Sequence, residues 1–294
     1  TDHHFDLFLS DSDEYHFTDT IIVQKTVRGY RIVDGFEIIN AGLPDHYQLP
    51  AVCFPENASL LTILRTLVEI KLKKRRLFPI EIARVFQMTR EHGISDAKLM
   101  ESLFSTLGLK SDESLIEQYL LLLSVNEPII NYLIDKNAPL KTWLLITKFN
   151  QADQSDLHDL IRLRPTLSVF EEIVISLYEI QKRENLTQKE LLTQLRWTML
   201  LTNENLESKE QIGQVRNAVF RRRFPLLSIH KDNVEMALRQ ISLPENARIH
   251  YDETFEKKEL VLHWRLSTET DIKKMRDFYT EDAIQKIQQL LDIL

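Results

Sequence analysis

Residues 59–76 read SLLTILRTLVEIKLKKRR, and the character of the chain changes at this stretch. Its apolar residues recur at three- and four-residue spacing, which places them on one face of a helix. They are Leu60, Leu61, Ile63, Leu64, Leu67, Val68 and Ile70. Strand patterns dominate before this stretch and helical patterns dominate after it. We therefore predict an α+β fold that is mostly helical, with a small α/β module followed by a long helical region.

The residues before this stretch are rich in β-branched and aromatic side chains and are interrupted by Gly or Pro, a pattern typical of strands. It predicts strands at Phe5 to Leu9, Thr20 to Val27, Tyr30 to Val33 and Ala51 to Phe54. Arg28-Gly29 suits a hairpin turn between two of them. Cys53, the single cysteine, sits in an apolar run, so we expect a buried thiol and no internal disulfide.

The residues after this stretch carry several helix start and stop signals. Thr187 with Glu190 and Ser208 with Gln211 have capping-box spacing, and Gly93 and Gly108 suit helix ends. The patterns predict helices at residues 79–92, 95–107, 112–125, 139–149, 165–184, 187–202, 208–221 and 231–241.

Near the end of the chain the apolar periodicity returns to two, first at Arg248 to Tyr251 and then at Leu260 to Leu266. Such alternation predicts a β-hairpin. The last stretch, from Ile272 to Leu291, is again amphipathic with helical spacing. We therefore predict a C-terminal ββα unit, with a boundary near Pro244.

The composition is that of a globular protein, with 43% apolar and 28% charged residues and only 6 Gly in 294 residues. A net charge of -7 gives no global attraction to phosphate, so nucleic-acid binding would depend on local basic patches. No stretch approaches the roughly 18 apolar residues of a membrane helix, and the acidic stretch from Thr1 to Glu14 does not fit a signal peptide. These features predict a cytoplasmic protein without a membrane partner.

Two basic patches stand out. The first basic cluster comprises Lys71, Lys73, Lys74, Arg75 and Arg76, and the second comprises Arg216, Arg221, Arg222 and Arg223. Either cluster would suit a nucleic-acid backbone or an acidic protein partner, and aromatic residues flank the arginines of the second. The alternatives are a solvated helix end for the first and, for the second, internal pairing with the acidic segments 1–19 or 91–135.

Motifs of catalysis and metal binding are missing from the sequence. It contains no His-Glu-x-x-His or paired-cysteine motif, no Gly-x-Ser-x-Gly elbow and no Walker-type loop. We therefore predict no catalytic residue, no metal site and no resident cofactor.

One segment carries a family resemblance. The run Leu77-Phe78-Pro79-Ile80-Glu81-Ile82-Ala83-Arg84-Val85-Phe86-Gln87 resembles the Leu-Asn-Pro-Ile-Glu-x-Ala-x-x-Tyr-Gln run of ParB-like proteins, and residues 91–99 are similar to the start of the helix-turn-helix in that family. The resemblance covers roughly residues 18–150. It implies a ParB/sulfiredoxin-like α/β module at 1–56 and a helix-turn-helix-like domain at 57–150. A further helical domain at 151–244 and the ββα unit at 245–294 complete our division of the chain.

The resemblance also implies a nucleotide site, because ParB-like proteins bind a nucleoside triphosphate at a Gly-Glu-Arg-Arg turn. Here Phe36, Glu37 and Ile38 follow Gly35, so a carboxylate replaces the first arginine and would face any phosphate. The second family motif, Glu-Asn-x-x-Arg, lacks its Asn. These departures argue against binding of CTP or ATP with magnesium. The residues that would contribute to such a site are Asp34, Gly35, Glu37, Glu69, Lys74 and Arg75.

The second helix of the helix-turn-helix, Asp112 to Leu123, is poorly suited to reading bases. It begins with Asp112 and Glu113, and residues 91–135 hold eight acids against two lysines. Only three of its residues have side chains that would read bases: Ser114, Gln118 and Tyr119.

Three hypotheses follow. The first is a ParB-like binding protein without enzymatic activity, associated with DNA or with a partition or regulatory complex. This protein would form a homodimer through its C-terminal ββα unit. The second is a nucleotide-dependent phosphotransferase or nuclease of the same superfamily, with Asp34, Glu37 or Glu69 as metal ligand or base and Lys73 to Arg76 as phosphate ligands. The third is sequence-specific DNA binding through residues 95–125.

Overall fold

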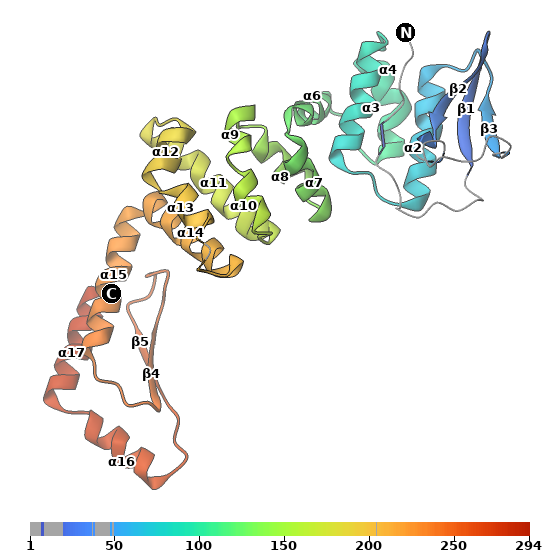
Figure 1. The fold of residues 1–294 in the computed structure, drawn as a ribbon. Helices are drawn as coiled ribbons and strands as arrows, with labels where there is room; N and C mark the ends of the chain where they lie inside the picture. The colour runs from blue at the N-terminus through green and yellow to red at the C-terminus, as the bar shows by residue number, and fades with distance from the viewer. Residues whose placement is uncertain (1–6, 9–19, 37, 39–47, 49, 204) are drawn as a thin grey trace. The chain divides into compact units, whose positions relative to one another are not determined.

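The computed structural model describes residues 7–8, 20–36, 38, 48, 50–203 and 205–294. The chain forms two compact units, residues 1–175 and 176–294, and the division falls within helix α11 (Leu167–Glu184). Both units are mostly helical and each contains one small sheet (Figure 1). The prediction of an α+β, mostly helical fold is therefore confirmed.

The N-terminal sheet has three strands in the order β2-β1-β3. Strand β1 (Ile21–Thr26) pairs antiparallel with β2 (Gly29–Asp34) and parallel with β3 (Ala51–Phe54). The hairpin places Thr26 opposite Gly29, so its turn lies at residues 27–28, one residue before the predicted Arg28-Gly29.

Two expectations for this region are corrected. Cys53 is exposed, because β3 forms an edge of the sheet and most of its residues face solvent. Of the strand expected at Phe5 to Leu9, only Leu7 and Phe8 are described, and neither lies in a strand.

A helical region follows the sheet. Helix α2 (Leu60–Lys74) leads into α3 (Pro79–Glu91), and residues 96–107 form one irregular helix made of α4 (Asp96–Leu99), a π-helical turn (Met100–Phe104) and α5 (Ser105–Leu107). Helix α6 (Ser114–Leu121) continues as a 3₁₀ turn (Leu122–Ser124). Phe86 of α3 is buried at the centre, 5.7 Å from the ring of Phe104 and 5.5 Å from that of Tyr119.

The rest of the N-terminal unit is built from short helices, three of which the sequence analysis did not predict. Helix α8 (Leu140–Ile146) matches an expected helix, whereas α7 (Glu127–Asp135), α9 (Gln151–Ser155) and α10 (His158–Arg162) were missed. Buried Gln154 joins two of these segments, because its side chain accepts from the backbone N–H of Asn126 and donates to the carbonyl of Phe149.

The C-terminal unit begins with the second half of α11 and continues with α12 (Gln188–Gln194), α13 (Trp197–Leu201), α14 (Ser208–Arg223) and α15 (Pro225–Gln240). The capping box of Thr187 and Glu190 is confirmed. The single helix expected at 187–202 is wrong, because Arg196 adopts a left-handed conformation that separates α12 from α13. The second capping box lies at Glu207 and Glu210, one residue before the expected pair.

The end of the chain forms the predicted hairpin, β4 (Ala247–Tyr251) and β5 (Leu260–Trp264), followed by two helices instead of one, α16 (Glu269–Phe278) and α17 (Glu281–Ile293). Thr280 accepts from the backbone N–H of Ala283 and so starts α17 as a separate helix. Val234 of α15 lies in the same hydrophobic core as Phe278 and Leu290, so α15 packs with the hairpin and the last two helices. Among the described residues, no helix combines the length and apolar content needed to cross a membrane.

Candidate functional site

Lys71 of the first basic cluster is a buried residue. Its side chain is only 3% exposed, and its Nζ lies 3.5 Å from the carboxylate of Asp34 at the end of β2. The ammonium group also lies 5.8 Å from the centre of the Phe8 ring. An ammonium group withdrawn from water requires such a partner, so this ion pair ties α2 to the sheet. The structure thus brings Asp34 and Lys71 together inside the unit.

Arg75 is also occupied internally. Its two terminal nitrogens donate to both oxygens of Glu81, at 2.9 and 2.7 Å, and Glu81 is fully buried. The backbone N–H of Phe78 donates to the same carboxylate at 2.8 Å, as in a capping box at the start of α3. The glutamate of the Pro-Ile-Glu run therefore fixes the junction between α2 and α3, with Arg75 as its counter-charge.

Gly35 has a steric role. Its φ of +91° favours glycine, and a Cβ atom at this position would lie 2.9 Å from Cγ2 of Ile21 and 3.2 Å from its Cα. The absence of a side chain thus allows the turn after β2 to pack on β1.

The other residues predicted for a nucleotide site are Glu69, Glu37 and Lys74. Glu69 is exposed on α2, where it forms an ion pair with Arg65 one turn earlier. Glu37 lies outside the described residues. Lys73, Lys74 and Arg76 have exposed side chains, so the surface-accessible part of the first basic cluster is these three residues.

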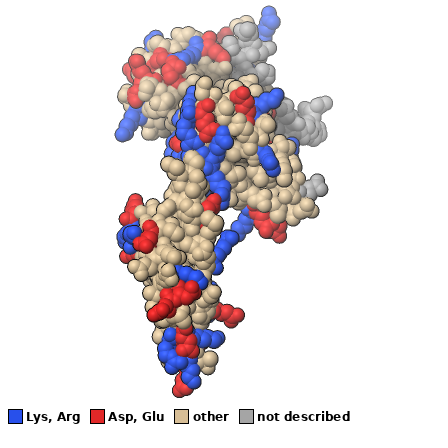
Figure 2. Space-filling view, turned by 90° about the vertical axis from the view of Figure 1, so that its left-hand side faces the viewer, with Lys and Arg blue, Asp and Glu red and all other residues tan. Residues whose placement is uncertain are grey.

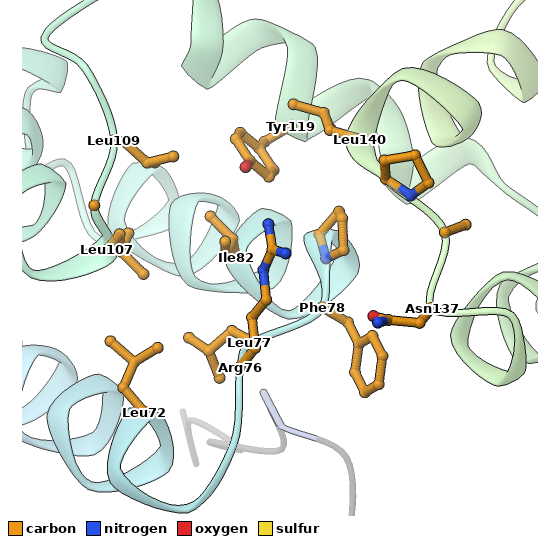
Figure 3. Close-up of a pocket in the computed structure, with 14 residues that line it drawn as sticks. Leu72, Arg76, Leu77, Phe78, Ile82, Leu107, Leu109, Tyr119, Asn137 and Leu140 are labelled. Atoms are coloured by element: carbon orange, nitrogen blue, oxygen red, sulfur yellow. The ribbon is translucent and has the colours of Figure 1, made fainter.

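Arg76 also lines a cavity of about 210 Å³ in the N-terminal unit (Figure 3). Its guanidinium group extends between Ile82 and Tyr119, and the side chain of Asn137 also lies at the cavity. Arg76 is the only charged residue among the described residues of the wall. The wall consists of Leu72, Arg76, Leu77, Phe78, Pro79, Ile82, Leu107, Gly108, Leu109, Tyr119, Asn137, Ala138, Pro139 and Leu140.

Two helix ends shape this cavity. Gly108 ends α5 with a left-handed conformation, and the N–H of Leu109 donates to the carbonyl of Phe104 at 2.8 Å. Asn137 follows α7 and also has a left-handed conformation. There the N–H of Ala138 donates to the carbonyl of Leu133 at 2.9 Å. Both arrangements are Schellman motifs, which hold the backbone of the wall in place.

The cavity wall is fixed further by two buried aromatic residues. The indole N–H of Trp143 donates to the carbonyl of Ala138 at 3.1 Å, and Trp143 is fully buried. Tyr119 is 5% exposed and packs edge-on against Phe86. Burial raises the pKa of the Tyr119 hydroxyl, while the positive charge of Arg76 opposes this rise. The two side chains are therefore electrostatic neighbours.

Three acidic residues of the segment predicted to read DNA, residues 95–125, make contacts within the protein. Asp112 accepts from the backbone N–H of Ser114 at 2.9 Å, and hydrogen bonds from the side chain and backbone of Ser114 lower the pKa of its carboxyl. Glu117 and Asp96 both bind Arg90 of α3, and these hydrogen bonds raise the pKa of that guanidinium group. Tyr119, expected to read bases, is instead buried in the core.

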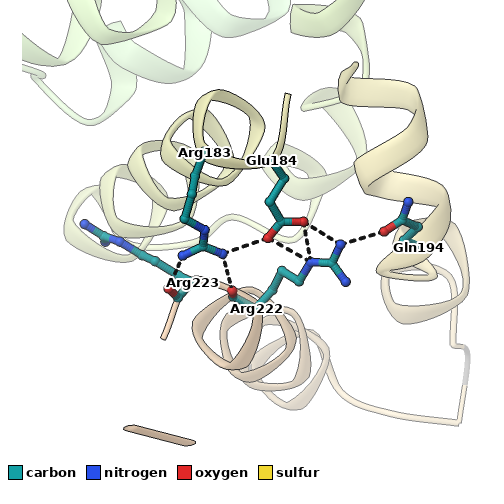
Figure 4. Close-up of polar contacts among 5 residues, drawn as sticks. All are labelled: Arg183, Glu184, Gln194, Arg222 and Arg223. Atoms are coloured by element: carbon teal, nitrogen blue, oxygen red, sulfur yellow. Dashed lines mark hydrogen bonds and ion pairs between the residues drawn. The ribbon is translucent and has the colours of Figure 1, made fainter. Parts of the chain in front are cut away.

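The second basic cluster forms an ion-pair network (Figure 4). Arg222 donates through Nε and a terminal nitrogen to Glu184 and also to the side-chain oxygen of Gln194 at 2.7 Å. Arg183, next to Glu184, donates to the carbonyls of Arg222 and Arg223 and so satisfies the C-terminal end of α14. The network joins α11, α12 and α14.

The electrostatics of Glu184 agree with this role. Burial by itself raises the pKa of its carboxyl, but the hydrogen bonds from Arg183 and Arg222 outweigh this effect, so the pKa is lowered. Arg223 pairs with Glu179 at 2.6 Å and donates to the hydroxyl of Ser176 at 3.0 Å.

The other arginines of the second basic cluster are at the surface. Arg221 binds both oxygens of Asp232, at 2.8 and 2.7 Å, and Arg216 is exposed. Internal pairing, one of the alternatives from the sequence, is thus found, but with Glu179, Glu184 and Asp232 as its acids. On the face drawn in Figure 2, basic and acidic side chains are interspersed.

No group of three or more His, Cys, Asp or Glu side chains with metal-site geometry occurs among the described residues. Neither the known family models nor the curated proteins include one that matches this chain.

Proposed function

We propose that this chain is a binding protein of ParB-like architecture without enzymatic activity. The observation that carries the proposal is the internal use of the motif positions: Asp34 pairs with Lys71, Arg75 pairs with Glu81, and Gly35 packs on Ile21. A nucleotide phosphate at these positions would compete with existing ion pairs, and breaking a buried pair is costly. The partners we propose are DNA or a protein of a partition or regulatory complex.

Calorimetric titration with CTP and ATP, with and without magnesium, tests the proposal. We expect no heat of binding at millimolar nucleotide. Magnesium-dependent binding that the double variant Lys73→Gln/Lys74→Gln abolishes would contradict the proposal and favour a nucleotide-dependent phosphotransferase or nuclease. Asp34→Ala alone is a poor control, because it breaks the buried ion pair with Lys71 and so changes stability as well as any nucleotide contact.

We also propose a homodimer through the unit of residues 176–294, with a surface that includes α15 in addition to the ββα unit predicted from the sequence. Leu226, Ile229 and Met236 lie on one side of α15 and are 82%, 58% and 56% exposed. Ile284 of α17 is also exposed. Exposed apolar side chains gathered on one surface are typical of protein contacts.

Light scattering after size-exclusion chromatography tests the homodimer. We expect the mass of a dimer for the wild type and of a monomer for Ile229→Asp/Met236→Lys. Leu121→Lys is the matched control, because Leu121 is an equally exposed apolar residue of the N-terminal unit. A monomeric wild type at micromolar concentration would contradict this part of the proposal.

A further inference from the structure

The cavity beside Arg76 carries an inference that is independent of the proposed function. Its wall has an uneven distribution of charge. Arg76 supplies one positive charge, and none of the other thirteen described wall residues is acidic. A guanidinium group that faces an uncharged cavity can bind an anion in a bidentate manner.

Neutral polar groups lie in the same cavity. Tyr119 contributes a phenolic hydroxyl, which can donate a hydrogen bond, and Asn137 contributes an amide with two donors and one acceptor. Figure 3 shows Arg76 near the middle of the group, with Tyr119 on one side and Asn137 on another. These donors come from three separate places in the chain: the linker between α2 and α3, helix α6 and the turn after α7.

Most of the other side chains of the wall are apolar and suit a hydrophobic body. Leu107, Leu109 and Leu140 line the cavity with Ile82 and Leu72. Its volume of about 210 Å³ is below that of typical drug-sized pockets, which begin at about 300 Å³. A dry apolar cavity of about 150 Å³ holds benzene, so this space suits one aromatic ring with a small polar group.

The site is also held in its present shape by the fold. The Schellman turns at Gly108 and Asn137 and the hydrogen bond from Trp143 to Ala138 fix the backbone around it. A preformed site loses little entropy when a ligand binds.

From these features we infer that the cavity binds a small organic carboxylate with a body the size of one aromatic ring, its carboxylate held by Arg76 and its ring packed on the leucines.

Benzoate is the probe for the test, with benzamide as a neutral molecule of the same shape and acetate as a carboxylate without the ring. The full chain is labelled at Leu and Ile methyl groups and titrated by NMR. We expect benzoate to shift the methyl signals of Leu107, Leu109 and Leu140, and both benzamide and acetate to bind at least about tenfold more weakly.

Substitutions locate the interaction. Arg76→Gln should weaken benzoate binding by about tenfold or more and make benzoate and benzamide equal. Lys73→Gln, which removes an exposed charge outside the wall, should leave binding unchanged. Tyr119→Phe keeps the buried ring but removes the hydroxyl donor, so it should weaken the binding of benzoate by about fivefold.

Any one of these results would overturn the inference: no shift of the cavity methyl groups, equal binding of benzoate and benzamide to the wild type, or full retention of benzoate affinity in Arg76→Gln. Circular dichroism of each variant establishes that the fold is intact. Inorganic sulfate that binds as tightly as benzoate would also count against it, because the apolar wall would then contribute nothing.

Discussion

The two basic clusters look alike in sequence but are used differently in the structure. In the second basic cluster, Arg221, Arg222 and Arg223 each bind a carboxylate, and the network joins three helices. In the first, Lys71 and Arg75 are occupied by Asp34 and Glu81, while Lys73, Lys74 and Arg76 remain exposed.

The difference teaches that a run of positive charges is not by itself a surface for phosphate. What decides is whether the fold brings acids to the same place. Glu184 is 38 residues from Arg222 in the chain, and no sequence spacing connects them. Substitutions that separate the internal pairs from the exposed charges can test this comparison.

Glu81→Ala should lower the free energy of unfolding more than any of the other substitutions, because it removes the counter-charge of Arg75 and the cap of α3 together. Breaking a buried ion pair costs roughly 3–5 kcal/mol, and we expect about 3 kcal/mol because Arg75, 23% exposed, can turn to water. Urea unfolding followed by Trp143 fluorescence, in a Trp197→Phe/Trp264→Phe background, measures the N-terminal unit.

The matched control is Glu69→Ala on the exposed side of α2. Its ion pair with Arg65 lies at the surface, where such pairs contribute about 0.5 kcal/mol or less. If Glu81→Ala and Glu69→Ala lower the free energy of unfolding by the same amount, the Arg75–Glu81 pair stabilises the fold no more than a surface pair.

Asp34→Asn should have the second largest effect. It removes the Asp34 carboxylate from the buried ammonium group of Lys71, and we expect breaking this ion pair to cost about 2 kcal/mol. Adding Lys71→Met should restore most of this loss, because the buried charge is removed as well. The same unfolding measurement on both single variants and the double variant gives the coupling energy. A coupling near zero would show that the two groups act independently.

Much of the fold could be predicted because it depends on local patterns. The apolar face of residues 60–70 predicted α2, and Gly108 marked the end of a helix. Helix α7, which the sequence analysis did not predict, has local signals as well: Asn126 at its N-cap and a proline in its first turn. The left-handed Arg196 that divides residues 187–202 had no such signal, because arginine rarely adopts this conformation.

The candidate site was harder to predict because it depends on contacts between distant residues. The exposed part of the first basic cluster was identified from sequence, but the burial of Lys71 was not, since a lysine in a basic run is usually solvated. The cavity has no sequence signature, because its wall comes from four separate segments between residues 72 and 140.

Glu184→Gln should have a smaller effect, on the order of 1 kcal/mol, because Arg183 and Arg222 can be partly solvated after the change. The loss of stability caused by this substitution should depend on pH. The pKa of Glu184 is lowered in the folded chain from its ordinary value of about 4.5, so the carboxylate stabilises the fold above that pH. The stability difference between wild type and variant should shrink as the pH falls through the folded pKa. A pH-independent difference in urea unfolding would contradict this assignment.

Lys73→Gln/Lys74→Gln should have the smallest effect on stability, because both side chains are exposed. Its effect on DNA binding distinguishes the two clusters. The quantity to compare is the slope of log K for DNA binding against log salt concentration. If the first basic cluster contacts a duplex backbone, each lost phosphate contact reduces the magnitude of this slope by about 0.9, so the double variant should reduce it by about 1.8. Arg221→Gln in the second cluster should leave the slope unchanged, because its guanidinium group already binds Asp232. Fluorescence anisotropy with labelled duplex DNA at several salt concentrations measures both slopes. If Arg221→Gln lowers the slope and the lysine variant does not, nucleic-acid binding belongs to the second basic cluster, and ion pairs with nearby acids do not prevent arginines from contacting phosphate.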